Sequence, residues 1–479
     1  MRSTLTLNID DPNLQKACSK ICNLVHHAGG RALLVGGCVR DNALNHPAND
    51  LDIEVYGIDT TTLKTILSHH FTIKLVGQAF GVMKILDLPI DVALPRREFK
   101  SGRGHRGFTI DSDPQMTPED AASRRDFTVN AIAFDPITGD IIDPYNGLDD
   151  LKHRVLKHVS KRFAEDPLRV LRGMQFASRF DFDISPDTVE ICRTLELEGL
   201  AAERVFDEWK KLILYGIRPS RGLTFLRDSE WIRYFPELFA LIGCPQDPAW
   251  HPEGDVWTHT LHCMDAFAAR RINDEREDLI VGLAVLCHDL GKPKTTMVEN
   301  GRITSKDHSS VGEKITRAFL SRMTNETALI DEVLPLVSAH LAPMQLFKAK
   351  ASDAAIRRLA RRVGRIDRLV RVAHADMLGR PPLQVNTFDA GDWLIKRART
   401  LEVEAAAPKP IILGRHLIQL GLKPGPHFGP IIEACFNAQI EDAFKTLQDG
   451  IEYAERKIRH YRSLHEVENE PPPHTDCSS

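Results

Sequence analysis

Long hydrophobic runs are missing from this sequence of 479 residues. No stretch of about 18 or more consecutive apolar residues occurs, so the sequence predicts no transmembrane helix. The first residues, MRSTLTLNIDDPN, lack the basic and then apolar pattern of a secretory signal peptide. We also find no internal repeat. A cytoplasmic protein without a membrane partner is therefore expected.

Paired cysteines and a large excess of one charge are missing too. The nine cysteines are scattered, and although Cys18 and Cys22 share a helix face, no second Cys or His pair completes a zinc site. Reduced, mostly buried thiols are therefore expected. The formal net charge of −4 argues against a protein that coats DNA like a histone, but local basic patches can still bind phosphate.

Basic residues gather in three local runs. Each run alone is typical of a solvated helix face, whereas three runs in one chain favour a nucleic-acid partner. The runs are RREFKSGRGHR (96–106), LKHRVLKHVSKR (151–162) and RRLARRVGRIDRLVR (357–371).

The first 150 residues have the pattern of an α/β unit. Residues 12–28 show apolar positions at helical spacing, and two glycines end that helix. RALLVGG, DLDIEVYG and FTIKLV have the patterns of strands, and DLDIEVYG alternates as a half-buried strand does. GVMKIL and IDVAL, on either side of DLP, predict a hairpin. We expect a mixed or antiparallel sheet here.

Beyond residue 150 the strand signals fade and helical periodicity dominates. The fold class predicted is therefore α+β, an α/β head with a mixed sheet followed by all-α domains. Breaks at 243–254 (GCPQDPAWHPEG) and 379–382 (GRPP) resemble linkers, and the polar end of the chain is typical of disorder. The expected domains are a head (1–150), a helical neck (151–242), a third domain (255–380), a helical tail (381–465) and a disordered end (466–479).

Two aspartates on the second predicted strand form a candidate metal site. Asp50 and Asp52 would face the same side, about 7 Å apart at roughly 3.3 Å per residue, with Glu54 beyond them. Two such carboxylates can share a pair of divalent cations, and Asp91 on a neighbouring strand could add a third ligand. Because these ligands are all oxygen atoms, they favour Mg²⁺ over zinc.

A glycine turn precedes these aspartates. Gly36 and Gly37 end the first strand, so backbone N–H groups can approach a phosphate there. Arg40 follows at the start of the next helix. A binding site for a nucleoside triphosphate needs this combination: amide donors and a cation for the phosphate oxygens, and carboxylates that hold metal ions.

The stretch VGGCVRDNAL…NDLDIEV resembles the signature of class II nucleotidyltransferases of the polymerase-beta superfamily. These are the tRNA CCA-adding enzymes and the bacterial poly(A) polymerases. Four more stretches resemble the family's later motifs, in the family's order. They are RRDFTVNA (124–131), DPYNGLDDL (143–151), EDPLRVLR (165–172) and ERVFDEWKKLI (203–213).

The resemblance implies template-independent addition of C, C and A to the 3′ end of tRNA. Asp50 and Asp52 would bind Mg²⁺, and Asp91 would add a third carboxylate, whose position varies within the family. The tRNA 3′ hydroxyl would attack the α-phosphate of CTP or ATP and release pyrophosphate. Because no covalent enzyme intermediate is needed, catalysis would come mainly from positioning the reactants and neutralising their charge. Gly37 and Arg40 would hold the triphosphate.

The second motif adds further contacts by the same resemblance. Arg125 would contact phosphate, and Asp126 would contact the ribose, which is one way to prefer NTP to dNTP. Arg124 is expected to be a surface charge, and Asn130 is either a structural hydrogen-bonding residue or part of the site. Asp41 is expected to orient Arg40 or to cap its helix.

The fourth motif resembles the family's nucleotide-selecting helix. Asp166 is predicted to cap a helix that has Pro167 at its first position, which places Arg169 on the same face and Arg172 one turn further on. In the family, such an Asp–Arg pair reads the base edge in place of a template strand. The alternative is a helix cap with an ordinary salt bridge.

Residues 97–123 are rich in glycine and charge and predict a mobile loop. The family has a flexible loop here that helps the switch from C to A. A full-length loop favours complete CCA addition over addition of CC alone.

A second candidate metal site comes from CHDLGK (287–292). The order His, His-Asp, Asp resembles the HD phosphohydrolase signature, which some bacterial CCA-adding enzymes carry, and places an HD domain at 255–380. Imidazole and carboxylate ligands suit Ni²⁺ or another transition metal, with Mg²⁺ as an alternative. The expected ligands are His259, His288, Asp289 and Asp376, while His262, His308 and His340 are more easily explained as structural, the last two also as parts of an extended site.

From this resemblance we predict a CCA tRNA nucleotidyltransferase. Its expected partners are tRNA, CTP and ATP, and we expect it to be a monomer or a homodimer. Basic helices of the neck and later domains should hold the tRNA acceptor arm. A bacterial poly(A) polymerase and an enzyme that adds only CC or only A remain alternatives. An alternative of another class is an HD phosphohydrolase whose head senses a nucleotide.

Overall fold

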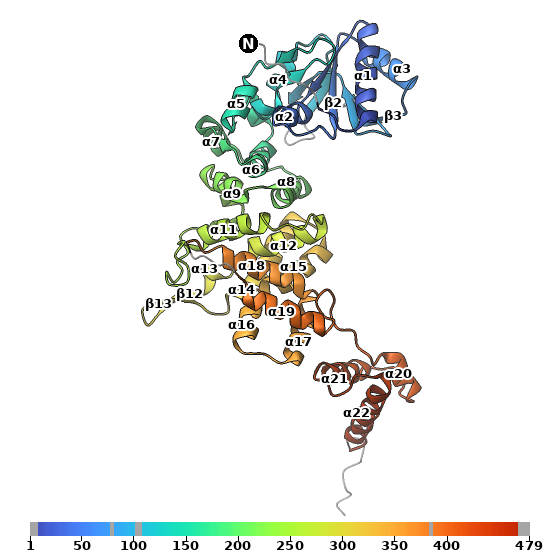
Figure 1. The fold of residues 1–479 in the computed structure, drawn as a ribbon, viewed down its shortest axis with the longest axis vertical. Coiled ribbons are helices and arrows are strands. Elements are labelled where there is room, and N and C mark those ends of the chain that lie inside the picture. The colour runs from blue at the N-terminus through green and yellow to red at the C-terminus, as the bar shows by residue number, and fades with distance from the viewer. Residues whose placement is uncertain (1–7, 77–80, 101–107, 383–386, 468–479) are drawn as a thin grey trace, which may run out of the picture.

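The molecule is elongated, and its parts follow one another along the long axis in chain order (Figure 1). This computed structural model describes residues 8–76, 81–100, 108–382 and 387–467. The predicted disorder from residue 468 onward lies outside these residues. Within the described ranges, no helix is both long enough and apolar enough to pass through a membrane.

The head is built on a seven-stranded mixed sheet, as the sequence predicts. The strand order is β3-β4-β5-β2-β1-β8-β9. Only the β2–β5 pairing is parallel, and β4 and β5 form the expected antiparallel hairpin. The strands are β1 (Arg31–Val35), β2 (Leu51–Tyr56), β3 (Ile73–Val76), β4 (Val82–Ile85), β5 (Ile90–Ala93), β8 (Ala133–Phe134) and β9 (Ile141–Ile142).

Helices cover both faces of this sheet. On one face, α1 (Pro12–His27), α2 (Gly37–Ala43) and α3 (Thr60–Ser68) close the main core. On the other face, Tyr56 packs against Met116 and Ala121, which belong to the segment around α4 (Pro118–Ser123). The prediction of a half-buried β2 is therefore wrong, because within that strand only Asp52 is exposed.

The described parts of the glycine-rich segment 97–123 form strands and a helix, where the sequence predicted a loop. Strand β6 (Arg96–Lys100) pairs with β7 (Phe108–Ser112) in an antiparallel ladder, and α4 follows. Residues 101–107 lie outside the described part of the chain, so the predicted mobility of the loop tip is not tested.

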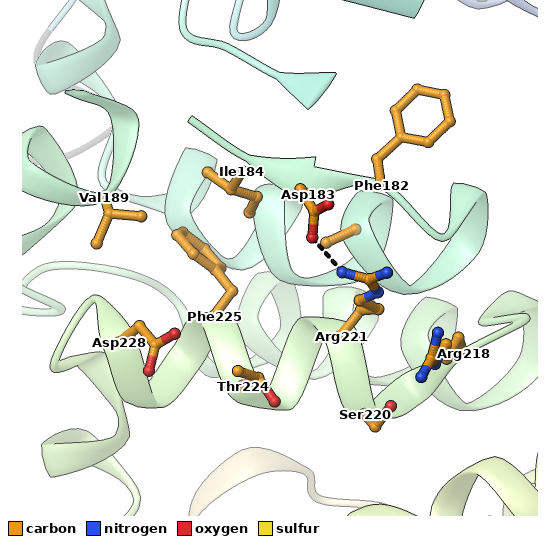
Figure 2. Close-up of a pocket in the computed structure, with 11 residues that line it drawn as sticks. Phe182, Asp183, Ile184, Val189, Arg218, Ser220, Arg221, Thr224, Phe225 and Asp228 are labelled. Atoms are coloured by element: carbon orange, nitrogen blue, oxygen red, sulfur yellow. Dashed lines mark hydrogen bonds and ion pairs between the residues drawn. The ribbon is translucent and has the colours of Figure 1, made fainter. Parts of the chain in front are cut away.

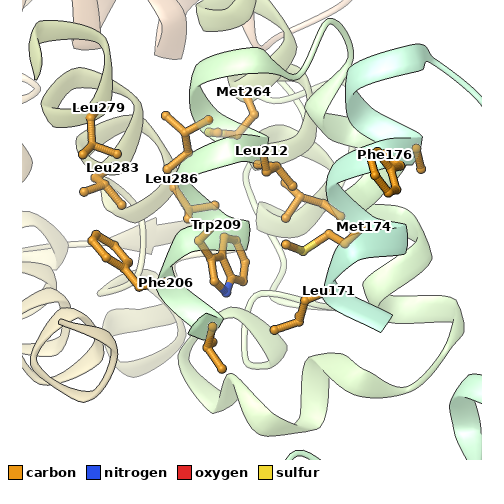
Figure 3. Close-up of a cluster of buried hydrophobic side chains, with 14 of the residues drawn as sticks. Leu171, Met174, Phe176, Phe206, Trp209, Leu212, Met264, Leu279, Leu283 and Leu286 are labelled. Carbon is orange, nitrogen blue, oxygen red and sulfur yellow. The ribbon is translucent and has the colours of Figure 1, made fainter. Parts of the chain in front are cut away.

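The neck packs around the long helix that carries the fourth motif. Helix α6 (Leu168–Phe180) lies against α8 (Ala202–Tyr215) and α9 (Pro219–Asp228). The apolar side chains of α6 and α8 join those of α11 (Val256–Ala268) and α12 (Glu275–Cys287) in one cluster, as Figure 3 shows around Trp209 of α8. One hydrophobic core therefore runs from the head through the neck into the next domain. The smaller neck elements are α5 (Gly147–His153), β10 (Val155–Leu156), β11 (Asp183–Ile184), α7 (Pro186–Arg193) and α10 (Pro236–Phe239).

The third domain is helical apart from one hairpin that the sequence analysis missed. Strands β12 (Thr296–Glu299) and β13 (Arg302–Ser305) are antiparallel. Asn300 and Gly301 between them both have positive φ, and an Asn-Gly pair is a strong hairpin signal. The remaining helices are α13 (Lys292–Thr295), α14 (His308–Met323), α15 (Thr327–Ala339), α16 (Ala342–Lys348), α17 (Asp353–Val363), α18 (Ile366–Leu378) and α19 (Asp389–Thr400).

The tail has a hydrophobic core of its own, which includes Ile412, Leu417 and Ile431. It consists of α20 (Gly414–Gln419), α21 (Phe428–Ile440) and α22 (Leu447–Val467) and lies at the far end of the molecule (Figure 1).

The third basic run does not present a free cationic surface. Arg361 of α17 lies 2.6 Å from Glu433 of the tail, and Arg368 of α18 lies 2.6 Å from Glu277. Arg357 and Arg371 are likewise paired with aspartates. Many charges of this run are therefore used to fasten helices together, and its contribution to holding tRNA stays a prediction.

Candidate functional site

The glycine turn in the head can be formed only with glycine at position 36. Gly36 has a φ of +75° and a ψ of −130°, a conformation that L side chains rarely adopt. A Cβ atom there would lie 2.9 Å from Nη1 of Arg125 and 3.7 Å from Oδ2 of Asp52. The turn thus brings backbone, guanidinium and carboxylate together at one point.

The predicted carboxylates gather beside this turn. Asp50 directly precedes β2, and Asp52 on β2 is the register partner of Asp91 on the parallel strand β5. Although Asp52 reaches solvent, partial loss of water around its carboxyl raises the pKa of Asp52; Asp50 and Asp91 raise it further, and Arg125 opposes the change. These mutual effects show that the three acids share one electrostatic environment.

The three oxygen donors do not yet form a tight cage. The described groups of metal-ligating atoms within 4.8 Å of one another do not include Asp50, Asp52 and Asp91 as a set. Lys84 Nζ lies 2.9 Å from Oδ2 of Asp91 and places a cation against that carboxylate. The donor chemistry fits a hard divalent ion such as Mg²⁺.

Glu54 of β2 does not belong to this group of three acids. It is only 4% exposed, pairs with Arg124 at 2.9 Å and accepts a hydrogen bond from the Tyr56 hydroxyl at 2.8 Å. Burial opposes ionisation of Glu54, but Arg125 and Arg124 hold its pKa below the usual value. Arg124 is therefore not the surface charge that the sequence suggested, since it fixes the covered face of the sheet.

A chain of buried polar contacts links the turn to the neck. Arg40 donates from Nη1 to Asn130 Oδ1 at 2.6 Å, and Asn130 Nδ2 donates to Asp126 Oδ1 at 2.9 Å. Arg172 of α6 then donates from Nε to Asp126 Oδ2 at 2.7 Å. Arg40 is 4% exposed and Asp126 is 7% exposed, so both predicted nucleotide ligands are engaged within the protein.

Asp41 has the role that the sequence predicted for it. Its Oδ1 accepts from Nε of Arg40 at 2.8 Å, which fixes the guanidinium orientation. The ring of Phe180 lies 4.6 Å below the same guanidinium. Arg40 is thus clamped between a carboxylate and an aromatic ring of α6.

In the fourth motif, both predicted base-reading side chains, Asp166 and Arg169, contact other groups of the protein. Asp166 Oδ1 accepts from the Leu168 N–H at 3.1 Å and so caps α6, as predicted, while its Oδ2 lies 3.1 Å from Arg204. Arg169 donates from Nη1 to the carbonyl of Arg162 at 2.7 Å and from Nη2 to that of Arg124. The side chains of Asp166 and Arg169 are therefore each placed by other groups.

A hollow of about 550 Å³ lies on the neck, between β11 and α9 (Figure 2). Arg221 reaches across it to Asp183, and Arg218 lies 3.7 Å from Asp181. Because both arginines that line it are paired with aspartates, this hollow offers little to an anionic ligand.

The third domain brings together all four residues of the predicted second metal site. His259 Nε2 lies 3.2 Å from Asp376 Oδ1 and 3.9 Å from Asp289 Oδ2. His288 Nε2 lies 3.2 Å from the same oxygen of Asp289. The four side chains come from α11, the end of α12 and α18, and all four residues are buried.

Two histidines expected to be structural join this cluster. Nε2 of His308 and of His340 lie 3.3 Å apart, and they lie 3.5 Å and 4.0 Å from Asp289 Oδ1. Asp289 therefore faces one pair of imidazoles with each oxygen; Oδ1 makes no hydrogen bond within the described protein, and Oδ2 forms an ion pair with Lys292 Nζ at 2.7 Å. The extended site, left open by the sequence, is thus formed in space, whereas His262 does not belong to the ligand groups of the described chain.

The imidazoles of this cluster are oriented for metal binding. Nδ1 of His288, His308 and His340 contacts a backbone carbonyl at 2.7, 2.7 and 2.8 Å, and Nδ1 of His259 contacts that of Gly379 at 3.0 Å. A carbonyl oxygen can only accept, so each Nδ1 carries the proton and each Nε2 of a neutral ring presents a lone pair. Lone pairs that face a carboxylate in this way suit a bound metal ion, although Lys292 Nζ already lies 2.7 Å from Oδ2 of Asp289.

Burial shapes the charges in this cluster. It lowers the pKa of His340 to about 4, so this ring is neutral at pH 7. Burial alone would raise the pKa of Asp289, but His288 and Lys292 hold it well below the usual range. A neutral imidazole beside a charged carboxylate is the state in which both residues bind metal.

Three further members of the site were missed from the sequence. Cys263 Sγ lies 3.3 Å from His259 Nε2, one helical turn along α11. His251 and His259 both lie 2.8 Å from Glu253 Oε1, which orients their rings. The break at 243–254 is therefore part of the site as well as a connection, and the sequence HPEGDVWTH contains its signal as clustered His and Glu.

Known protein families match most of the chain. A family described as "Poly A polymerase head domain" matches residues 32–157, and one described as "Probable RNA and SrmB- binding site of polymerase A" matches 181–242. A family described as "HD domain" matches 256–372, which contains the imidazole cluster.

Curated relatives match the chain over most of its length. A multifunctional CCA protein of Xanthomonas campestris pv. campestris (strain B100) is 36% identical over 424 residues, which is 86% of this chain and 98% of the relative. One of Stenotrophomonas maltophilia (strain R551-3) is 36% identical over 375 residues, or 75% and 89% of the two chains.

Solved structures share the fold. The CCA-adding enzyme of Bacillus stearothermophilus in complex with CTP superposes with a TM-score of 0.66 at 23% identity, covering 95% of this chain and all of that one. The Thermotoga maritima CCA-adding enzyme complexed with tRNA gives 0.56 at 19% identity, covering 94% and 96%. At these identities the likeness establishes the fold.

Proposed function

Because this chain belongs to the multifunctional CCA proteins, we propose that it adds C, C and A to the 3′ end of tRNA from CTP and ATP. One observation carries the proposal: Asp52 and Asp91 are in register on parallel strands directly beside the Gly36 turn. Carboxylates next to a backbone turn suit a metal-dependent transfer of a nucleotide.

Asp50 and Asp52, with Asp91, would hold Mg²⁺, which when bound neutralises phosphate charge. The protein's own groups position the reactants. Backbone at Gly36 and Gly37 allows the triphosphate to approach closely, and Arg125 at the same turn supplies a cation. The tRNA 3′ hydroxyl then loses its proton to solvent as its oxygen bonds to the α-phosphorus and the bond to pyrophosphate breaks.

Arg40 and Asp126 contribute through the buried chain of contacts to Arg172. Since little of either side chain reaches solvent, they would act on the nucleotide by fixing the turn and the start of α6. Asp166 and Arg169, at that start, would read the base edge once a nucleotide displaces their present partners.

The imidazole cluster would serve as a metal-dependent phosphohydrolase that acts in repair of tRNA ends. His259, His288, Asp289 and Asp376 are the proposed ligands, and their nitrogen atoms favour a transition metal such as Ni²⁺ over Mg²⁺. A bound metal ion would supply Lewis acidity for attack by water on a phosphate ester.

The proposed units are a head (1–150), a neck (151–242), an HD domain (255–380) and a tail (381–465). The family matches and the separate core of the tail support these limits.

The test is an incorporation assay with three tRNA ends: bare, ending in C and ending in CC. We expect CMP on the first two and AMP only on the third. AMP on any RNA end would favour a poly(A) polymerase, and CMP without AMP would favour a CC-adding enzyme. No incorporation on any of the three ends, together with a phosphohydrolase activity that Asp52→Ala spares and His288→Ala abolishes, would instead favour the HD phosphohydrolase with a nucleotide-sensing head.

A further inference from the structure

An open pocket of about 270 Å³ leads to the imidazole cluster. Asp289, His308, His340 and Asp376 lie at this pocket, together with the cations Lys292 and Arg380. Its volume of about 270 Å³ is just below the range of roughly 300–1,000 Å³ that small-molecule sites span. The pocket therefore suits one small phosphate ester or the terminal unit of a longer chain.

A tryptophan lines the same pocket with most of its surface exposed. Trp250 is 63% exposed, whereas Trp209, Trp231 and Trp257 are at most 1% exposed. A single exposed apolar residue is ordinary, but an indole in the wall of a polar pocket offers a flat face to a ligand. Ile303 of β13 adds apolar surface to the pocket.

The backbone holds Trp250 in place. The N–H groups of Trp250 and His251 both donate to the carbonyl of Asp247, at 3.0 and 2.9 Å, and the Ala249 N–H donates to its side chain at 3.0 Å. The next residue, His251, packs edge-on against the ligand His259, with ring centroids 4.9 Å apart. The indole is thus tied to the cluster by a fixed turn.

Arg380 supplies an unused donor in this pocket. Its Nη2 lies 2.7 Å from Asp376 Oδ1, while its Nε is buried and makes no hydrogen bond to the described protein. A buried donor without a partner is costly, and a phosphate oxygen would satisfy it. The pocket thus combines an aromatic face with a group that can bind phosphate.

We propose that Trp250 stacks on the base of a nucleotide whose phosphate ester reaches Arg380 and the imidazole cluster, so that this pocket selects nucleotides over other phosphate esters. This rests on the proposed phosphohydrolase function. In the reaction, water oxygen bonds to phosphorus, the ester P–O bond breaks, and the leaving alcohol takes a proton.

Two substrates test the proposal on the full-length, metal-loaded protein: adenosine 3′-monophosphate and glycerol 2-phosphate. Base stacking is worth about 1–3 kcal/mol, or roughly 5- to 150-fold. Trp250→Ala should raise KM for the nucleotide by such a factor and leave KM for glycerol 2-phosphate within about twofold. Trp250→Phe should keep most of the preference. Phe239→Ala, which removes an exposed ring (53%) that does not line the pocket, should change neither KM.

Tryptophan fluorescence separates this proposal from the hydrolase function. The first 208 residues, which include the whole head, contain no tryptophan. A nucleotide bound to the head therefore has no tryptophan of the head to quench. If neither ester is hydrolysed, the proposed phosphohydrolase fails, yet quenching by adenosine 3′-monophosphate in the wild type but not in Trp250→Phe still supports the stacking. Equal quenching in both proteins, or equal KM changes for both esters, overturns it.

Discussion

Replacing Asp126 by Asn should weaken the junction between head and neck. The Asp126 carboxylate is 7% exposed and accepts from the Phe127 N–H, Asn130 Nδ2 and Arg172 Nε at 2.7, 2.9 and 2.7 Å. An amide at this position loses the charge that Arg172 pairs with and turns an N–H donor toward one of these donors. The guanidinium is then left without its counter-ion.

The size of the effect follows from the pKa of Asp126. Burial opposes ionisation, but Arg172, Asn130 and the Phe127 N–H together lower this pKa from the ordinary 3.8 to about 2. At about 1.4 kcal/mol per pH unit, the folded carboxylate contributes about 2.5 kcal/mol. Because the folded pKa is depressed, this stability is present above about pH 4 and is lost as the pH falls toward 2.

Amide hydrogen exchange at Phe127 and Asn130 measures local opening without assuming that the whole chain unfolds at once. Asp126→Asn should speed exchange at these amides on the order of 50-fold at pH 7. At pH 3 the difference in opening free energy between wild type and variant should be about half of its value at pH 7. Asp149→Asn is the control, since Asp149 is 67% exposed and 3.4 Å from His153, and should cost under about 0.5 kcal/mol. Equal exchange in both variants at pH 7 would refute the reasoning.

Three more substitutions test other parts of the structure. Gly36→Ala should lower CMP incorporation at least about tenfold, because its Cβ would lie 2.9 Å from Arg125 Nη1 at a φ of +75°; unchanged incorporation would argue against a tight turn. Asp289→Asn should lower bound metal, measured by elemental analysis, and abolish phosphate-ester hydrolysis while sparing CMP incorporation; full metal content would contradict the ligand assignment. Arg361→Ala should leave tRNA affinity in a filter-binding assay unchanged but speed proteolysis before the tail, since Arg361 pairs with Glu433; weaker tRNA binding would instead support the predicted tRNA contact of that basic run.

The sequence predicted what depends on local pattern. The mixed sheet, the β4–β5 hairpin and the capping of α6 by Asp166 were predicted from strand alternation and from the Asp-Pro pair. Eight of the nine cysteines lie in the described chain, and all eight are buried and free of disulfides, as expected. These features are set by residues close together in the chain.

The errors concern contacts between residues far apart in the sequence. No local pattern shows that Arg40 would be buried against α6, or that Arg124 would pair with Glu54. His308 and His340 join the metal cluster only because α14 and α15 pack beside α12. The β12–β13 hairpin is different, since its Asn-Gly turn was present in the sequence and was overlooked.

The most direct test of the central claim is CMP incorporation into tRNA lacking CCA by Asp52→Asn, with His288→Ala as the matched control in the second centre. We expect Asp52→Asn to lose incorporation by about 10³-fold or more, on the scale of losing a principal charge-stabilising group, while CTP still protects the head from proteolysis. His288→Ala should incorporate CMP at the wild-type rate. Wild-type incorporation by Asp52→Asn would contradict the account.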